Sequence, residues 1–437
     1  MSRSSTDANE EPLALPQDTA QSPFSLPQET AQASLQSTSD LHAVGVQDTS
    51  AQSPFSLPKE TAQTTLQSTT DLHAVGVQDT SVMQEILLVE DDDFMFQNYP
   101  KLKEVIVHRS MIRHDIIDVF KDPEILKHRL NITVINANGY PEKGEGAGVL
   151  RDVLTNFWHE FFISLSAGGT EKTPHIRHDL QKPEWQAIAR VLVFGYEKAK
   201  YFPVQLSQFF ILCCLFGEES LGRESLLQAY RCYVPADDGE ILDKVQSREL
   251  DPNDEDLLEF LSSNKCYKAP TKENIASIVL ELVHQELIQK PRYITNCWSP
   301  ILKTLQNDAN SIFSTPQQVE QLYEEKQPTA KKVNKLFIAS VSTDAERQSL
   351  DFLKRYVKSL EKKALERFLH FLTGSDVLTC DSIEITFTTL HGFSRRPVVH
   401  ICGPTLELPT TYECFAELAE EFTSIMREST SWSFDIV

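Results

Sequence analysis

A 29-residue segment near the start of the chain occurs twice and contains few large apolar side chains. SPFSLPQETAQASLQSTSDLHAVGVQDTS (22–50) returns 31 residues later as SPFSLPKETAQTTLQSTTDLHAVGVQDTS (53–81), and four of the 29 paired positions differ. A solenoid needs three or more units with a recurring apolar face, whereas this segment is rich in Ser, Thr, Gln and Pro. It buries too little surface to offset the entropy of ordering. We therefore expect residues 1–85 to form a disordered, acidic, duplicated tail, with a folded repeat as the alternative.

The tail is followed by a short apolar run and an acidic run. Ile86, Leu87, Leu88 and Val89 precede Glu90-Asp91-Asp92-Asp93. This pattern resembles a SUMO-interacting motif, in which an apolar strand adds to the edge of the SUMO sheet and the acidic residues meet a basic rim. Segment 86–93 is therefore a candidate SUMO-binding site. The alternative is that it forms the first strand or a packing arm of the following domain.

Charge and hydropathy exclude several classes of partner for the whole chain. The 437 residues include 41 Lys and Arg against 63 Asp and Glu, a formal net charge of −22. Nucleic acids and anionic membranes both reward basic surfaces, so neither is expected as a partner. The longest apolar run, Phe209 to Phe216, is far shorter than the roughly 20 residues of a membrane span. The first residues lack a secretory signal pattern, so we expect the protein in the cytoplasm, the nucleus or both.

The eight cysteines indicate free thiols and no structural metal. No CxxC pair occurs, and the HxxH pair His175 and His178 has no second ligand pair nearby. A structural zinc site needs two such pairs. We therefore predict no metal site, and the motifs imply no cofactor.

Residues from about 95 onward read as globular, first mainly helical and then mixed. Apolar spacing predicts helices over 105–120, 149–162, 270–289, 351–374 and 412–426, with Pro270 and Thr271 at the start of the third. Alternation predicts strands over 131–137 and at Ile383, Ile385 and Phe387. GEGAG (144–148) lacks a phosphate-loop pattern and predicts a tight strand-to-helix corner. RRPVVHICGPTLELP (395–409) is expected to be rich in loops.

Several of these segments resemble pieces of the HECT-type E3 ubiquitin ligases. HICGPTLELP (400–409) is similar to the family's catalytic loop, and FLHFLTGSD (368–376) is similar to its FLxFxTGS helix end. VHRSMIRHDIIDVF and GAGVLRDVLTNFWHEFF are similar to the start of the family's N-lobe with its GGVxRE corner. TKEN (271–274), TPQQVEQLYEE (315–325) and the closing SFDIV also match in order. The branch that the sequence most resembles is that of the G2/M-phase-specific E3 ligases.

The resemblance implies a bilobed α+β domain behind the disordered tail. A mostly helical N-lobe would span 95–325, a hinge 326–331, and a small mixed α/β C-lobe 332–437. The implied partners are an E2 ubiquitin-conjugating enzyme, ubiquitin and a protein substrate. The implied activity is transfer of ubiquitin from the E2 to a substrate lysine through a thioester on the ligase.

The catalytic residues that the resemblance implies are Cys402, His400 and Phe434. Cys402 would be the nucleophile, His400 an electrostatic or hydrogen-bonding aid, and Phe434 an anchor for the acceptor or a lobe. Thiol-to-thioester exchange is nearly isoenergetic, so it needs mainly a thiolate and correct placement. Arg395 and Arg396 would add positive charge or form a solvated pair. Cys414, the rival thiol, is expected to pack on the last helix.

The sequence departs from the family pattern at three places. Ile401 replaces the usual Thr before the cysteine, and Gly403-Pro404 replaces Phe-Asn after it. The stretch between the 209–216 helix and Thr271 is short and has no obvious counterpart of the subdomain that docks the E2. A catalytically silent adaptor that binds ubiquitin, SUMO or an E2 is therefore the alternative function.

Overall fold

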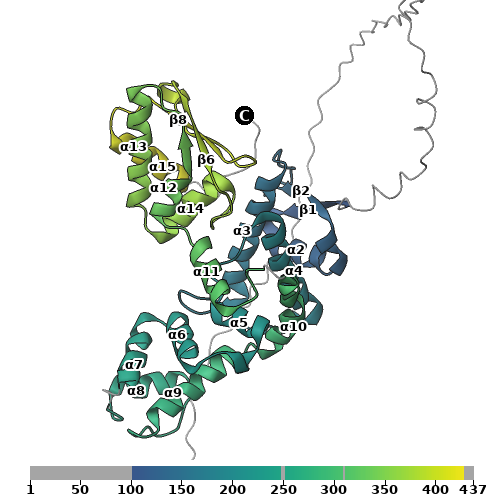
Figure 1. The fold of residues 1–437 in the computed structure, drawn as a ribbon, viewed down its shortest axis with the longest axis vertical. Helices are drawn as coiled ribbons and strands as arrows, with labels where there is room; N and C mark the ends of the chain where they lie inside the picture. The colour runs from purple at the N-terminus through teal and green to yellow at the C-terminus, as the bar shows by residue number, and fades with distance from the viewer. Residues whose placement is uncertain (1–100, 248–250, 309–310, 428–437) are drawn as a thin grey trace, which may run out of the picture. The chain divides into compact units, whose positions relative to one another are not determined.

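The computed structural model describes residues 101–247, 251–308 and 311–427. The duplicated tail (1–85), the candidate SUMO-binding segment (86–93) and Phe434 lie outside the described residues. The chain is a mixed α+β protein of many helices and a few short strands (Figure 1). Its buried apolar side chains form three groups. Among the described residues, no helix is both long and apolar enough to cross a membrane.

The first core lies between a two-stranded parallel sheet and helices from two stretches of the chain, 112–216 and 292–326. Strand β1 pairs with β2 in parallel, from Leu102 opposite Arg129 to His108 opposite Ile135. Its elements are β1 (Leu102–His108), α2 (Ile112–Phe120), β2 (Arg129–Ile135), α3 (Ala147–Ser164), α4 (Lys182–Ala199), α5 (Gln208–Phe216), α10 (Arg292–Leu302) and α11 (Pro316–Lys326). A short hairpin of β3 (Ser166–Ala167) and β4 (Thr173–Pro174) follows α3. Edge-to-face contacts among Trp158, Phe210 and Trp298 join α3, α5 and α10.

The second core is a small group of helices between α5 and α10. It comprises α6 (Arg223–Tyr233), α7 (Ala236–Ser247), α8 (Glu255–Ser263), α9 (Ile275–His284) and the π-helical turn Gln285–Gln289. No subdomain was recognisable in this stretch from the sequence, yet its apolar residues form a core of their own. Figure 1 shows α6, α7, α8 and α9 gathered as one group of helices. Phe209 and Cys213 of α5 also contribute to this second core.

The third core lies between four helices and a four-stranded sheet. The strand order is β5-β6-β8-β7, with β5, β6 and β8 parallel and β7 antiparallel to β8. The elements are α12 (Ala330–Leu336), β5 (Phe337–Ala339), α13 (Asp344–Ser359), α14 (Lys362–Thr373), β6 (Ile383–Thr388), β7 (Val398–His400), β8 (Thr405–Pro409) and α15 (Phe415–Arg427). Three residues separate α11 from α12, and the side chain of Thr329 caps α12 by accepting from Lys332 N.

Two predicted helices are wrong over part of their length. Residues 105–108 belong to β1, because Val105 and Val107 point into the first core while Ile106 is 61 % exposed. The predicted helix 351–374 is two helices, α13 and α14, separated by the extended residues Leu360 and Glu361. The break lets Tyr356 of α13 and Phe368 of α14 both contact Phe422 of α15, at ring distances of 5.5 and 5.6 Å.

Three further boundaries differ from the expectation. Helix α9 starts at Ile275, because Thr271 and Asn274 form a hydrogen-bonded turn before it. The last helix starts at Phe415. The segment 395–409, expected to be rich in loops, contains strands β7 and β8, which pair from Val398–Glu407 to His400–Thr405. The predicted strand at 383–387 and the corner before α3 are confirmed. The strand predicted over 131–137 is present as Arg129–Ile135, two residues nearer the N-terminus at each end.

Candidate functional site

Cys402 lies in the turn that joins β7 to β8. The turn comprises residues 401–404, and the Cys402 side chain is exposed. Its Sγ lies 2.5 Å from the main-chain oxygen of Glu145, to which the thiol donates a hydrogen bond. Glu145 belongs to the corner before α3, a helix of the first core. The turn of the small sheet is therefore seated against the beginning of α3.

Glycines permit this close approach. A Cβ on Gly148, in the first turn of α3, would lie 2.6 to 2.8 Å from the side chain and carbonyl of Ile401. A Cβ on Gly374, just after α14, would lie 2.7 Å from the oxygen of Gly148. Gly374 also has a φ of +76°, where L side chains are strained. The contact between α3, α14 and the cysteine turn is therefore made backbone to backbone.

Side chains of α3 bind main-chain oxygens on the other side of this contact. Arg151 donates from Nε to the oxygen of Thr373 over 2.7 Å and from Nη2 to the oxygen of Ile401. Thr155 Oγ1 donates to the oxygen of Gly374 over 3.1 Å. Arg151 thus connects the end of α14 directly to the residue that precedes Cys402.

A buried ionic network lies beside this contact. Asp152 accepts from Arg109 Nη1 over 2.6 Å, and His370 Nε2 of α14 lies 2.8 Å from its other oxygen. Arg109 also donates to both carboxylate oxygens of Glu142, over 2.9 and 2.8 Å. Burial alone would raise the pKa of Asp152, but hydrogen bonds and charge from His370 and Arg109 lower it overall. Asp152 is therefore held as an anion that bridges α14 to the first core.

A second carboxyl group at the contact behaves in the opposite way. Tyr201 donates its hydroxyl to Asp376 Oδ1 over 3.0 Å. Burial raises the pKa of Asp376 above its ordinary value, and the charge of His370 and the Tyr201 hydrogen bond offset this only in part. Burial and the charge of Asp376 also raise the pKa of Tyr201. One carboxyl group with a lowered pKa, Asp152, and one with a raised pKa, Asp376, therefore both lie at this contact.

The other sequence-predicted residues face away from the thiol or pair elsewhere. His400, on β7, places Nε2 2.8 Å from Glu407 Oε1 across the hairpin. Arg395 forms ion pairs with Glu417 and Glu421 of α15 and lies 4.8 Å over the ring of Tyr412. Arg396 is exposed. The charge of Arg395 is thus paired with carboxylates of α15.

The expectation that Cys414 packs on the last helix is wrong. Cys414 is exposed and precedes the first residue of α15, whereas Phe415 packs against Phe352 and lies under Arg355. Among the described cysteines, Cys402 and Cys414 are the exposed thiols. The two residues therefore compete as nucleophiles on grounds of access, and Cys402 alone is seated on α3.

Sequence reasoning missed Arg151, Asp152 and His370 as parts of the site. Arg151 and Asp152 stand in the segment GAGVLRD, and His370 stands in FLHFLTG, both of which were recognised as motifs without a role for these residues. The available signal was the presence of charged residues inside two otherwise apolar helix segments.

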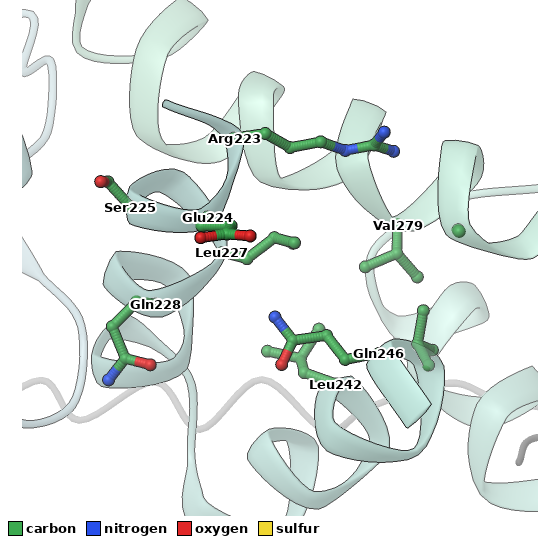
Figure 2. Close-up of a pocket in the computed structure, with 10 residues that line it drawn as sticks. Arg223, Glu224, Ser225, Leu227, Gln228, Leu242, Gln246 and Val279 are labelled. Carbon is green, nitrogen blue, oxygen red and sulfur yellow. The ribbon is translucent and has the colours of Figure 1, made fainter. Parts of the chain in front are cut away.

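A separate groove lies on the second core (Figure 2). It has a volume of about 890 Å³ and lies between α6, α7 and α9, with Arg223 and Glu224 on one side and Leu242 and Gln246 facing them. Its lining includes no cysteine or histidine. Within the described ranges, no three His, Cys, Asp or Glu side chains gather as metal ligands. The exposed cysteine thiols of the described residues, Cys402 and Cys414, therefore lie outside this groove.

Comparison with known protein families and curated sequences assigns no function to this chain. No protein-family model matches this chain, and no curated protein sequence matches it.

Proposed function

We propose that the protein is a HECT-like E3 ubiquitin-protein ligase that carries ubiquitin as a thioester on Cys402. The observation that supports this most is the exposed Cys402 thiol, placed at a tight β-turn and seated against α3. In this proposal the first and second cores form the N-lobe and the third core forms the C-lobe. The helices α6–α9 are then the part of the N-lobe available for E2 docking.

The proposed reaction has two group-transfer steps. The Cys402 thiolate attacks the carbonyl carbon of the E2-bound thioester, a new carbon–sulfur bond forms, and the E2 cysteine leaves as a thiolate. A substrate lysine amine then attacks the thioester on Cys402, an amide bond forms, the Cys402 thiolate leaves, and the amine loses a proton to solvent. Neither step requires a metal or an oxidant, and both require a thiolate with access to large partners.

The test is to mix the full-length protein with a panel of ubiquitin-charged E2 enzymes. We expect a ubiquitin adduct that reductant removes, that Cys402→Ala abolishes and that Cys414→Ala retains. Cys402→Ser should give an adduct that resists reductant, because an oxygen ester replaces the thioester. An adduct that depends on Cys414 instead would contradict the assignment of the nucleophile.

The second candidate function is a silent adaptor that binds ubiquitin, SUMO or an E2. It is favoured by Ile401 and Gly403-Pro404, which flank Cys402 in place of the residues usual in the family. The absence of any adduct across the panel, together with binding of ubiquitin or of an uncharged E2 by the folded protein, would favour this function.

A further inference from the structure

Strand β1 has an outward face that carries exposed apolar side chains. Leu102 and Ile106 are each 61 % exposed. Val105 and Val107, which lie on the opposite face of the same strand, are buried in the first core. Strands β1 and β2 form a two-stranded sheet and run in the same direction. Parallel sheets are normally covered on both faces, and an isolated pair of strands is only marginally stable, so a further segment on β1 would stabilise this sheet.

The main-chain groups of β1 alternate between its two edges. Arg129 N donates to Lys101 O over 3.0 Å, so the odd-numbered residues of β1 turn their N–H and C=O groups toward β2. The even-numbered residues turn theirs toward the other edge. At His108 this outer N–H donates to the Asp115 carboxylate over 2.8 Å. Over 102–106, no hydrogen bond from the described residues reaches the outer edge.

The outer edge of β2 is covered, in contrast to that of β1. Asn136 N donates to Tyr140 O over 2.9 Å, and Glu142 N donates to Val134 O over 2.8 Å. The chain therefore returns along β2 directly after that strand ends. An unpaired edge is a template for another strand. The side of this sheet that a further strand can join is thus the outer edge of β1.

The chain directly before β1 carries apolar side chains suited to such a strand. Residues 94–96, here called the Phe-Met-Phe segment, lie outside the described residues. Five residues (97–101) connect the segment to Leu102, and they include Asn98 and Pro100, which favour turns. Hairpin loops of four or five residues are common, so a connection of this length permits the segment to lie beside β1.

We propose that the Phe-Met-Phe segment forms an edge strand antiparallel to β1 and covers its outward face. A five-residue loop places Phe96 opposite Leu102. Phe94 then lies opposite Glu104, and directly opposite side chains share one face of a sheet. Both rings therefore lie on the exposed face of β1, where Phe94 also reaches Ile106 as a diagonal neighbour. A register shifted by one residue would replace the two rings on this face by Met95.

The proposal also sets where the folded domain begins. The acidic run 90–93 directly precedes the segment and would end the strand, because charged side chains at an edge oppose further pairing. The domain then starts at Phe94, before the first residue of β1. The candidate SUMO-binding segment (86–93) would adjoin the sheet without a linker. This inference is independent of the ligase proposal, which concerns Cys402.

The test measures amide hydrogen exchange of single residues in the full-length protein. We expect the N–H of Glu104, which faces the outer edge, to be protected in the wild-type protein because it donates to the Phe94 carbonyl. Phe94→Ser combined with Phe96→Ser should accelerate its exchange about tenfold or more, because the rings no longer hold the strand on β1. The N–H of Val105, which faces β2, should keep most of its protection. Unprotected exchange of Glu104 in the wild-type protein would overturn the proposal.

The duplicated tail supplies a matched control. Phe24→Ser combined with Phe55→Ser removes two phenylalanine rings at the same position of each repeat. Exchange at Glu104 should then stay within about twofold of wild type. An equal acceleration by both pairs of substitutions would contradict a specific role of the Phe-Met-Phe segment.

Photo-crosslinking identifies what covers the edge. With benzoylphenylalanine incorporated at position 94, we expect crosslinks within one chain to residues 102–108 or 129–135. Crosslinks between two chains would show that a second copy covers β1, and crosslinks that avoid both strands would place the segment elsewhere. Either result would overturn the proposal. Neither measurement uses ubiquitin or an E2, so their outcome is separate from that of the ligase test.

Discussion

At the scale of single residues, the contact around Cys402 depends on two glycines that lack a Cβ as much as on the side chains that donate hydrogen bonds across it. Gly148 and Gly374 let the backbones of α3, the end of α14 and the cysteine turn approach closely. Arg151 and Thr155 donate hydrogen bonds across this contact. A Cβ at either glycine overlaps main-chain atoms, which cannot rotate away as a flexible side chain can. Substitutions at these glycines should therefore move backbone.

Gly148→Ala tests this directly. The new Cβ would overlap the Ile401 carbonyl that Arg151 binds, so the cysteine turn must shift. We expect a net loss of about 1–2 kcal/mol in the free energy of unfolding, because overlap outweighs the gain of about 1 kcal/mol in helix propensity. The measurement is urea unfolding, with Gly403→Ala as the matched control.

The control residue, Gly403, lies in the cysteine turn beside Cys402, where an added Cβ would meet open space. No atom lies within 4 Å of a Cβ at Gly403, so Gly403→Ala should change stability by less than about 0.5 kcal/mol. Equal stability of the two variants would show that the turn does not press on α3.

Asp152 and Asp376 should give stability opposite dependences on pH. The pKa of Asp152 is lowered in the folded protein, so the unfolded chain binds more protons and the stabilisation is lost as pH falls below about 4. The pKa of Asp376 is raised, so the folded protein binds more protons and this group stabilises the fold as pH falls. Compared with wild type, Asp152→Asn should therefore lose less stability between pH 6 and 3, and Asp376→Asn should lose more.

The measurement is urea unfolding at half-unit steps across that range. Asp152→Asn should also be less stable at pH 7, by about 3 kcal/mol, because Arg109 and His370 lose a buried charged partner. Parallel pH curves for all three proteins would show that neither carboxyl group is coupled to folding.

At the scale of elements, the local pattern of apolar residues identified most helices and strands but not the residues at which they begin and end. Residues 105–107 carry apolar side chains that suit a helix or a strand. Pairing with β2, 27 positions further along the sequence, determines that they form a strand. The break between α13 and α14 has no proline or glycine at Leu360 or Glu361. It is set by packing of both helices on α15, which no local pattern reports.

The candidate site divides in the same way. Cys402 as the candidate nucleophile was accessible from the motif HICGPTLELP, whereas its position between β7 and β8 and its seat on α3 were not. Arg151 binds oxygens 222 and 250 residues further along the chain. Such contacts depend on the tertiary fold, so the role of Arg151 could be found only from the structure.

At the scale of the whole molecule, the described residues build three cores rather than one. The buried residues of α6–α9 form a group distinct from those around the β5–β8 sheet. Each group buries its own apolar side chains, so local opening of one need not open the other. A substitution that creates a cavity in the second core should therefore accelerate local opening of α6–α9 only.

Leu257→Ala and Leu258→Ala form a matched pair for this prediction. Leu257 is fully buried in the second core and Leu258 is 43 % exposed on the same helix. Leu257→Ala should destabilise the group by about 2–5 kcal/mol and accelerate amide hydrogen exchange in α6–α9, while α12–α15 keep their protection. Leu258→Ala should exchange as wild type does, and acceleration throughout the molecule in Leu257→Ala would show a single cooperative unit instead.

Because Arg151 and Thr155 donate to main-chain oxygens, the residues that supply those oxygens can be substituted without loss of the hydrogen bonds. Thr373, Gly374 and Ile401 offer main-chain oxygens, which every amino acid possesses. Position 401 can therefore exchange threonine for isoleucine and keep its bond to Arg151 intact. A contact made through the backbone therefore tolerates side-chain substitutions around Cys402, provided that Gly148, Gly374 and Arg151 are kept.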